Sequence, residues 1–346
     1  MTPFCVPYKK EVIKLTEKIK ITLPSQTLEL LRKDCADFLF LKEDRSPNMN
    51  DFLNTLVLHY YESFSADEEA LHDDIKKALF SVPEAYKEDA FKSVVEVFAK
   101  REKRQFDEGK SASISLKPTK ESEAATVTIE HVLLKDESLS SYYRRLFVSY
   151  AQKRKNEREK ILYKDAYSAL LHALKKETRV CILLQSGRVI PNASLYAVLP
   201  AKDELFNYVL LHDSEKNVTV RLAKIKAVSL LPDKAEIPPD SKALFDKQIA
   251  CAPQYPMRES DNCPIRVQLT EKGRILFERI YLYRPTPTKI EGAVYTFECS
   301  EAQVLFYFQR FGDDALILSP RRLGISMRNY HHFALKKYRA LYVGDK

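Results

Sequence analysis

The feature that most constrains the fold is a strand–helix–helix pattern near the start of the chain, which recurs about ninety residues later. Residues 18–24 alternate apolar Ile19, Ile21 and Leu23 with polar side chains, which is the period of a half-buried β-strand. Ser25 is the expected N-cap of a first helix, and a second amphipathic helix follows Asn50. A unit this small cannot cover its own apolar face, so a second copy is expected to pack against it.

The second copy is found in the same chain. Ile114 and Leu116 lie 95 positions after Ile19 and Ile21. The apolar positions of the second helix recur after 90 positions, Phe52, Leu53, Leu56 and Tyr60 corresponding to Tyr142, Tyr143, Leu146 and Tyr150. We therefore predict an internal repeat, 18–64 and 113–152, whose two strands pair antiparallel. The alternative is a chance match between two amphipathic helix pairs.

A short basic strand followed by two amphipathic helices resembles the ribbon-helix-helix family, a DNA-binding fold. The resemblance implies that the outward strand residues Lys18, Lys20 and Thr22 face nucleic acid. The helical segments between and after the two copies complete an N-terminal domain, which we place at residues 1–158.

Charge is distributed unevenly along the chain. Residues 1–64 carry 9 basic and 9 acidic side chains, residues 65–175 carry 21 and 20, and residues 176–346 carry 26 and 19. The C-terminal half therefore holds +7 of the total +8, which favours attraction to phosphate there. A surplus of this size is also compatible with a domain that is merely well solvated.

From Arg179 onward the pattern changes to five short apolar strands within some fifty residues, which predicts a small β-barrel. The segments Phe206–Val209 and Val220–Ile225 resemble the WYL domain, named for a Trp-Tyr-Leu strand. Here only Tyr208 of that triplet remains, and Lys224 stands where the downstream family pattern has a second arginine. The resemblance implies that Arg221 and Lys224 reach a phosphate, with Tyr208 as a stacking surface for unpaired bases. Arg188 is a fourth candidate.

Strands and helices from Ile265 to the basic C-terminal helix resemble the extension that often follows a WYL domain. We expect strands at Ile265–Leu269 and Ile275–Tyr283, and a helix that begins at Ser300. The whole arrangement is similar to the WYL accessory proteins of type VI-D CRISPR systems and to WYL transcription regulators. We place the WYL domain at residues 159–236 and the extension at residues 237–346.

Two further sites are expected in the extension. The basic run that contains Arg321, Arg322 and Arg328 is interleaved with aromatics, a composition that suits single-stranded nucleic acid, although the charges of such a helix can also remain solvated. Four aromatics crowd six positions, more than a short helix can bury in a small domain. They predict a homodimer interface: Phe306, Tyr307, Phe308 and Phe311.

Catalytic and metal motifs are missing from the sequence. It holds seven glycines and no phosphate-binding glycine loop, no nucleophile elbow and no zinc-type histidine or cysteine spacing. We expect no catalytic residue, no metal and no cofactor. The six cysteines are expected to be buried thiols of a cytoplasmic protein, and no apolar run is long enough to span a membrane.

The expected fold class is α+β and multidomain: a ribbon-helix-helix-like helical domain, a small WYL β-barrel and an α+β extension. The favoured function is a non-catalytic protein that binds single-stranded RNA and stimulates an RNA-guided CRISPR nuclease. The candidate partners are single-stranded RNA, duplex DNA, that nuclease and a second copy of the chain, with no membrane. The alternatives are a ligand-responsive, DNA-binding transcription regulator and a structural dimer that docks a protein.

Overall fold

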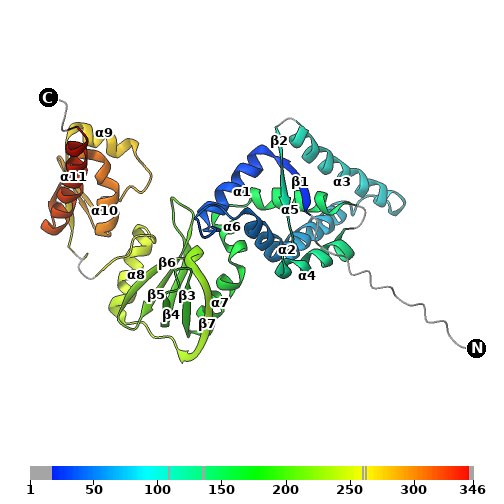
Figure 1. Cartoon of the computed structure of the whole chain (residues 1–346), viewed down its shortest axis with the longest axis horizontal. Coiled ribbons are helices and arrows are strands. Elements are labelled where there is room, and N and C mark those ends of the chain that lie inside the picture. Colours follow the sequence, from blue (N-terminus) through cyan, green and yellow to red (C-terminus); the bar gives the residue numbers. More distant parts are fainter. Residues whose placement is uncertain (1–17, 108–109, 135–136, 259–260, 262, 343–346) are drawn as a thin grey trace, which may run out of the picture. The chain divides into compact units, whose positions relative to one another are not determined.

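The computed structural model describes residues 18–107, 110–134, 137–258, 261 and 263–342. The chain divides into two units, Met1–Leu162 and Tyr163–Lys346 (Figure 1). The described residues form an α+β protein with three antiparallel sheets. None of the helices in these ranges is both long and apolar enough to cross a bilayer.

The first unit contains a two-stranded ribbon, β1 (Ile19–Pro24) with β2 (Ser111–Leu116). The strands are antiparallel, and Ile19 lies opposite Leu116 while Ile21 lies opposite Ile114. The predicted pairing of these four residues is confirmed. The inward Ile21 is fully buried and Lys20 is exposed, so the ribbon has one apolar and one polar face.

Helices follow each strand in a similar order. The helices of the first unit are α1 (Ser25–Asp37), α2 (Met49–Ala78), α3 (Glu84–Asp107), α4 (Lys120–Thr128) with a π-helical turn (Ile129–Leu133), α5 (Leu139–Gln152) and α6 (Lys155–Leu162). Asn48 caps α2 by accepting from the Asp51 N–H, and Ser138 caps α5 by accepting from the Ser141 N–H. The predicted cap at Ser25 is wrong: the residue before α1 is Pro24, which has no side-chain acceptor, and the Ser25 N–H donates to the Lys110 carbonyl instead.

The core of the first unit is where the two helix pairs meet. All eight apolar positions of the repeat are at most 1 % exposed: Phe52, Leu53, Leu56, Tyr60, Tyr142, Tyr143, Leu146 and Tyr150. Tyr60 and Tyr150, which are equivalent in the two copies, lie edge to face with their ring centres 6.5 Å apart. Burial raises the pKa of both Tyr142 and Tyr143 to about 12.

A buried ion pair fastens α1 to α6. The Arg158 Nε lies 2.6 Å from Asp34 Oδ2, and Asp34 is 1 % exposed. The Tyr150 hydroxyl donates to the same carboxylate oxygen at 3.0 Å. These hydrogen bonds offset the cost of burying the charges. Arg158 and its neighbour Glu159 are buried, although the charged stretch 152–160 has the composition of a surface segment.

The second unit begins with α7 (Lys164–Lys176) and a five-stranded sheet in the order β6-β5-β4-β3-β7. Its strands are β3 (Thr178–Leu184), β4 (Val189–Pro200), β5 (Asn207–Asp213), β6 (Lys216–Arg221) and β7 (Ile225–Lys234). Leu170 and Ala173 of α7 pack on the sheet's apolar face. We expect a closed barrel here, whereas the described strands form an open sheet. The 3₁₀ turn Leu222–Lys224 carries the chain from one edge strand to the other without a ladder between them.

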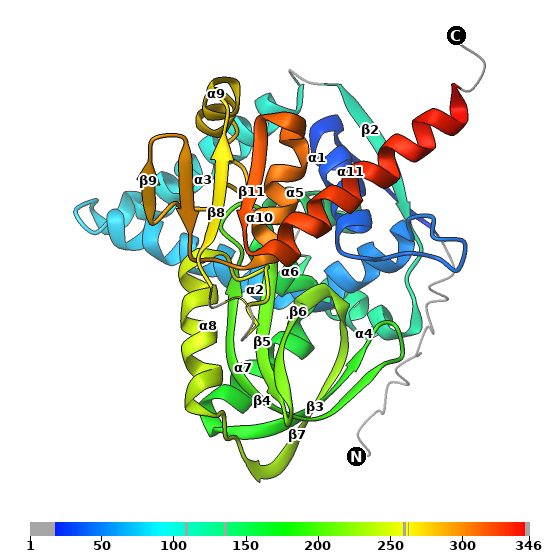
Figure 2. The same cartoon turned by 90° about the vertical axis from the view of Figure 1, so that its left-hand side faces the viewer.

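The rest of the second unit packs four strands against helices, with α11 passing over β11 (Figure 2). Its elements are α8 (Pro239–Cys251), β8 (Ile265–Leu269), α9 (Glu271–Arg279), β9 (Lys289–Glu291), β10 (Val294–Phe297), α10 (Glu301–Phe308), β11 (Ala315–Ser319) and α11 (Arg321–Leu341). Ser300 caps α10, as expected. The strand expected at Ile275–Tyr283 is wrong: Thr270 caps a helix by accepting from the Gly273 N–H, and the inward residues Gly273 and Phe277 are four apart.

The aromatics expected at a dimer interface are largely core residues. Tyr307, Phe308 and Phe311 are at most 3 % exposed and pack with Phe277 and Phe297 inside their own chain. The premise that a small domain cannot bury them is therefore wrong. Only Phe306 remains 39 % exposed, and its ring contacts Tyr283 and Tyr255.

The five cysteines in the described residues are free thiols of mixed exposure. Cys35 and Cys299 are buried, whereas Cys251 and Cys263 are exposed, so the expectation of buried thiols holds for only part of the set. Cys5 lies outside the described residues. Burial raises the pKa of the Cys35 thiol to about 11.

Candidate nucleic-acid interface

Three side chains from adjacent segments form a small platform beside the five-stranded sheet. Tyr208, near the start of β5, lies directly opposite Arg221, the last residue of β6. The Arg221 guanidinium carbon lies 3.3 Å from the centre of the Phe206 ring, and the Tyr208 hydroxyl donates to Glu204 at 2.8 Å. Tyr208 and Arg221 are both half-buried. Their contacts fix the orientation of the Arg221 guanidinium and of the Phe206 and Tyr208 rings.

Two further cations lie next to this platform. The 3₁₀ turn places the exposed Lys224 three residues after Arg221. The Gln185 N–H donates to the Lys224 carbonyl at 2.8 Å, and the Leu184 N–H donates to the Arg188 carbonyl at 2.9 Å. These backbone bonds bring the β3–β4 turn, with the exposed Arg188, against the 3₁₀ turn. We call Tyr208, Arg221, Lys224 and Arg188 with Phe206 the Arg221 cluster.

The chemistry of the Arg221 cluster suits a phosphodiester strand with unpaired bases. Arg221, Lys224 and Arg188 are three cations on neighbouring segments, and positive charge attracts phosphate. Aromatic rings and guanidinium planes are the surfaces on which proteins stack unpaired bases. The structure pairs Tyr208 with Arg221 across the strands, and backbone hydrogen bonds place the turn of Lys224 against the turn of Arg188. Phe206 and Glu204 are contacts that the sequence pattern does not reveal.

The ribbon residues form a second, separate basic surface. Lys20 is exposed and Thr22 is half-exposed on the polar face of β1, and Lys18, which directly precedes the strand, is exposed. The Thr22 hydroxyl lies 3.2 Å from the Ser113 hydroxyl of β2. On the outer edge of the ribbon, the Arg144 Nε donates to the Thr22 carbonyl at 2.8 Å. A two-stranded ribbon of this width fits the major groove of DNA.

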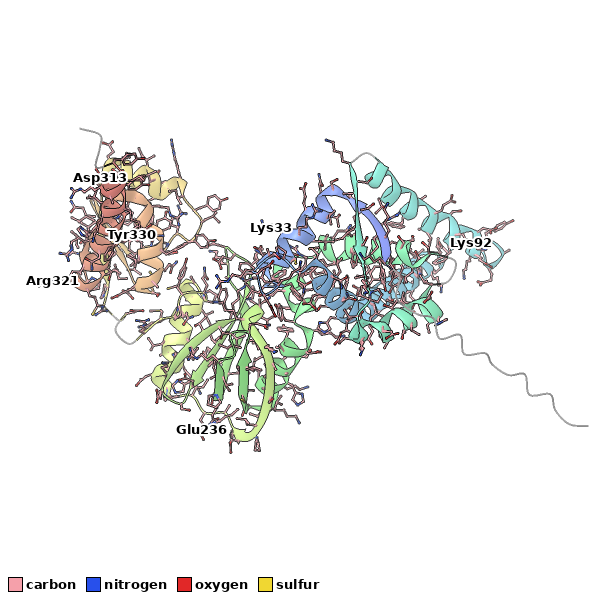
Figure 3. The ribbon with its side chains drawn as sticks, viewed as in Figure 1. Lys33, Lys92, Glu236, Asp313, Arg321 and Tyr330 are labelled. Atoms are coloured by element: carbon pink, nitrogen blue, oxygen red, sulfur yellow. The ribbon has the colours of Figure 1, made fainter. Side chains whose placement is uncertain are left out.

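The C-terminal arginines Arg321, Arg322 and Arg328 lie on α11. None of the described hydrogen bonds, ion pairs or ring contacts links them to the Arg221 cluster. Arg321 is exposed at the start of the helix, and Tyr330 lies nine residues further along it (Figure 3). Arg322 is engaged by Glu301, and the hydrogen bond raises the arginine's pKa. Arg328 donates to its neighbour Asn329 at 3.3 Å.

Tyr196 on β4 is a packing residue. Its ring stacks on Phe245 of α8 with centres 4.9 Å apart, and its hydroxyl donates to Asp246. Asp213 accepts from the Lys216 N–H in the β5–β6 turn.

No family model matches the chain, and no curated protein matches it. Among solved structures, it is similar to one described as the crystal structure of a CRISPR Cas-related protein, with 17 % sequence identity, 97 % of each chain covered and a TM-score of 0.66. The chain therefore has the fold of that protein. A second match is proteasome accessory factor B/C (PafBC) of Arthrobacter aurescens, with 14 % identity, 97 % of this chain and 52 % of that chain covered, and a TM-score of 0.25, which is too low to carry an argument.

Proposed function

We propose that the chain is a non-catalytic, single-stranded RNA-binding protein that stimulates an RNA-guided CRISPR RNA nuclease in the cytoplasm. The observation that carries the proposal is the Arg221 cluster, in which adjacent strands and hydrogen-bonded turns carry three cations, one of them over the Phe206 ring. The shared fold with a CRISPR Cas-related protein supports the CRISPR assignment. The resemblance to the WYL accessory proteins of type VI-D systems supports the choice of nuclease.

The proposal is tested by measuring target-RNA cleavage by a type VI-D effector with and without this protein. We expect the wild-type chain to accelerate cleavage. With Arg221→Ala, the cleavage rate should stay close to the rate measured without this protein. The exposed Lys175 on α7, outside the Arg221 cluster, gives a matched charge-removing control in Lys175→Ala, which should stimulate like wild type. Equal stimulation by all three proteins would contradict the role of the cluster, and no stimulation by any would contradict the function.

A DNA-binding regulator is the second candidate, and the ribbon favours it. The polar face of β1 and β2 carries Lys20, Thr22, Ser113 and Ser115, a set of exposed or half-exposed side chains on one side. This pattern fits the ribbon-helix-helix reading of the first unit, with two copies in one chain. A sequence-selected duplex bound more tightly than single-stranded RNA of the same length would favour this candidate.

We also propose that the chain forms a homodimer, with an interface made of residues other than the buried aromatics Tyr307, Phe308 and Phe311. β11 is an edge strand of its sheet, and its Leu316 is 60 % exposed. On α11 only Leu323 and Met327 are buried, and the same helix face continues through exposed Tyr330 and Tyr338. Exposed edges and apolar stripes are surfaces that proteins usually cover. Two Arg221 clusters in one assembly would raise the avidity for a long RNA.

A further inference from the structure

The outer part of α2 and the facing part of α3 form a helical hairpin at the edge of the first unit, where Lys92 marks it in Figure 3. The buried residues of α2 end at Phe64. All residues from Ser65 to Phe98 are described, and none of them is buried. Because a helix in a protein is stabilised mainly by packing its apolar face, two helices without a buried side chain offer a surface to a further element. We call residues 69–98 the α2–α3 hairpin.

Contacts of Phe91 join the two helices of the hairpin. The centre of the Phe91 ring lies 5.5 Å from the centre of the His72 ring on α2, and the Lys76 Nζ lies 5.6 Å from it. Tyr86 comes five residues before Phe91, which is about 140° around the helix. The side of α3 that carries Tyr86 therefore faces away from α2.

An apolar stripe runs along this outward side of α3. Its ends, Tyr86 and Val97, are each 65 % exposed, and Ala90 and Val94 between them are half-exposed. Spacings of four, four and three residues place the four side chains on one face of the helix. We call these four residues the Tyr86 stripe. Exposed apolar faces of this kind mark places where proteins bind one another.

The hairpin is acidic, although the chain as a whole carries +8. Residues 69–98 contain seven acidic and four basic side chains, a charge of −3, and the segment ends before the basic run at positions 100–104. Each of the four lysines lies 3.9 Å or less from a carboxylate on its own helix, in the pairs Asp73–Lys76, Asp74–Lys77, Glu84–Lys87 and Glu88–Lys92. Asp89 and Glu96 are seven residues apart, about two turns, so both lie along the same border of the stripe. A partner that covers the stripe therefore meets two carboxylates.

This charge selects among the possible occupants of the stripe. Carboxylates repel the phosphates of RNA, DNA and lipid headgroups. A second copy of the hairpin carries the same negative charge and is repelled as well. A protein helix whose apolar face is bordered by lysines or arginines complements both features of the surface, since exposed helix faces of this spacing pack against each other.

We propose that the Tyr86 stripe docks a basic amphipathic helix of the CRISPR nuclease that this chain stimulates. The inference rests on the proposed function, to which it adds the docking surface for the nuclease. The apolar side chains of the partner cover Tyr86 and Val97, and its cations face Asp89 and Glu96. RNA-guided nucleases hold their guide duplex in positively charged channels, so basic surface is available on such a partner. The Arg221 cluster belongs to the second unit, so the contacts with protein and with RNA use different residues.

The test is a titration of the fluorescently labelled full chain with a type VI-D effector loaded with its guide RNA. The Arg221→Ala chain is used, so that contacts through RNA are weakened. It should bind the effector with a Kd below about 10 µM. The affinity should fall between about 0.1 M and 1 M salt, because salt screens exposed charges. Absence of binding would refute the docking surface, whereas the proposed function would still stand if the wild-type chain stimulated cleavage.

Two double variants of the hairpin locate the contact. Tyr86→Ser with Val97→Ser should weaken effector binding at least about tenfold, and Asp89→Lys with Glu96→Lys should do the same by turning attraction into repulsion. Leu171→Ser on α7 and Glu278→Lys on α9, both at exposed positions of the second unit, are the matched controls and should bind normally. Unchanged effector binding by either double variant would refute the proposal.

The variant with Tyr86→Ser and Val97→Ser, made with Arg221 intact, separates the nuclease from the other occupants. Circular dichroism should show an unchanged helix content, and the affinity for single-stranded RNA and the mass in light scattering should match wild type, while stimulation of cleavage is reduced. Weaker RNA binding would assign the stripe to nucleic acid, and a halved mass would assign it to a second copy. Either result would overturn the proposal.

Discussion

Tyr208 and Arg221 lie opposite each other on adjacent strands, and the Arg221 guanidinium carbon also lies 3.3 Å from the centre of the Phe206 ring. Because Tyr208 and the Phe206 ring both flank the Arg221 side chain, few of its rotamers are available. An arginine held in this way loses less entropy when it binds a phosphate or a base. The pair therefore joins the architecture of the sheet to the proposed recognition of RNA.

The buried Asp34–Arg158 ion pair is expected to contribute to the free energy of unfolding of the first unit. Asp34→Ala leaves the guanidinium buried without its carboxylate, and we expect a loss of about 3–5 kcal/mol in the free energy of unfolding, measured with urea. Asp37→Ala is the matched control, three residues along α1, because its ion pair with Lys155 is more exposed and is expected to contribute about 1 kcal/mol or less. Equal losses in the two variants would contradict the account.

Alkaline pH should destabilise the protein in a defined window. Burial raises the pKa of Cys35 to about 11 and those of Tyr142 and Tyr143 to about 12. These groups ionise at lower pH in the unfolded chain, so unfolding releases protons between about pH 9 and pH 12. The stabilisation is complete below about pH 9 and is lost as the pH rises through the folded-state values.

Urea denaturation at a series of pH values from 8 to 12 checks this window. The midpoint should be nearly constant at the lower end and should fall at the upper end. Cys35→Ala should flatten the first part of the fall, between about pH 9 and pH 11, and leave the tyrosine part. A midpoint that rises with pH in this range would contradict the assignment.

The ribbon and the Arg221 cluster are expected to bind different nucleic acids. Lys20→Ala should weaken duplex DNA binding and lower the slope of log affinity against log salt by about 0.9, the value for one lost phosphate contact. Single-stranded RNA binding should stay nearly unchanged, since the cluster lies in the other unit. Fluorescence anisotropy with both ligands measures this, and equal losses on both would indicate one shared surface.

The dimer is tested by light scattering. The expected mass is twice the 40.0 kDa of one chain. Leu316→Glu combined with Tyr338→Glu places charges on the edge strand and on the α11 stripe and should give monomers, whereas Tyr86→Glu, an equally exposed position on α3, should not. A wild-type monomer at micromolar concentration would rule the dimer out.

Much of the fold of the first unit could be predicted from the sequence, because the internal repeat indicates both which residues face inward and which strand residues pair. The period-2 strand at Ile19 and the ninety-residue spacing of the helix positions determine which residues face inward, and the observed pairing of Ile21 with Ile114 agrees. The length of α2 does not follow. The first copy of the repeat ends at residue 64, but nothing near Ser65 breaks a helix, and α2 continues to Ala78.

The second unit is less predictable because tertiary contacts decide its details. The alternation from Ile275 onward fits a strand, yet the Thr270 cap and the burial of Phe277 make it a helix. The burial of Phe308 could not be predicted from its own segment, because its aromatic neighbours in the core include residues of other segments. In the candidate site, Arg221 and Tyr208 follow from the family pattern, but the position of the Phe206 ring beside Arg221 depends on three-dimensional packing.

Binding of single-stranded RNA by Arg221→Ala is the most direct test of the central claim. Fluorescence anisotropy at fixed salt should show a loss of about 1–3 kcal/mol relative to wild type, with Lys224→Ala and Arg188→Ala weakened less and Lys175→Ala unchanged. Arg221→Lys should recover only part of the loss, because an ammonium keeps the charge but not the planar fork. A folded Arg221→Ala protein that binds RNA as tightly as wild type would contradict the account.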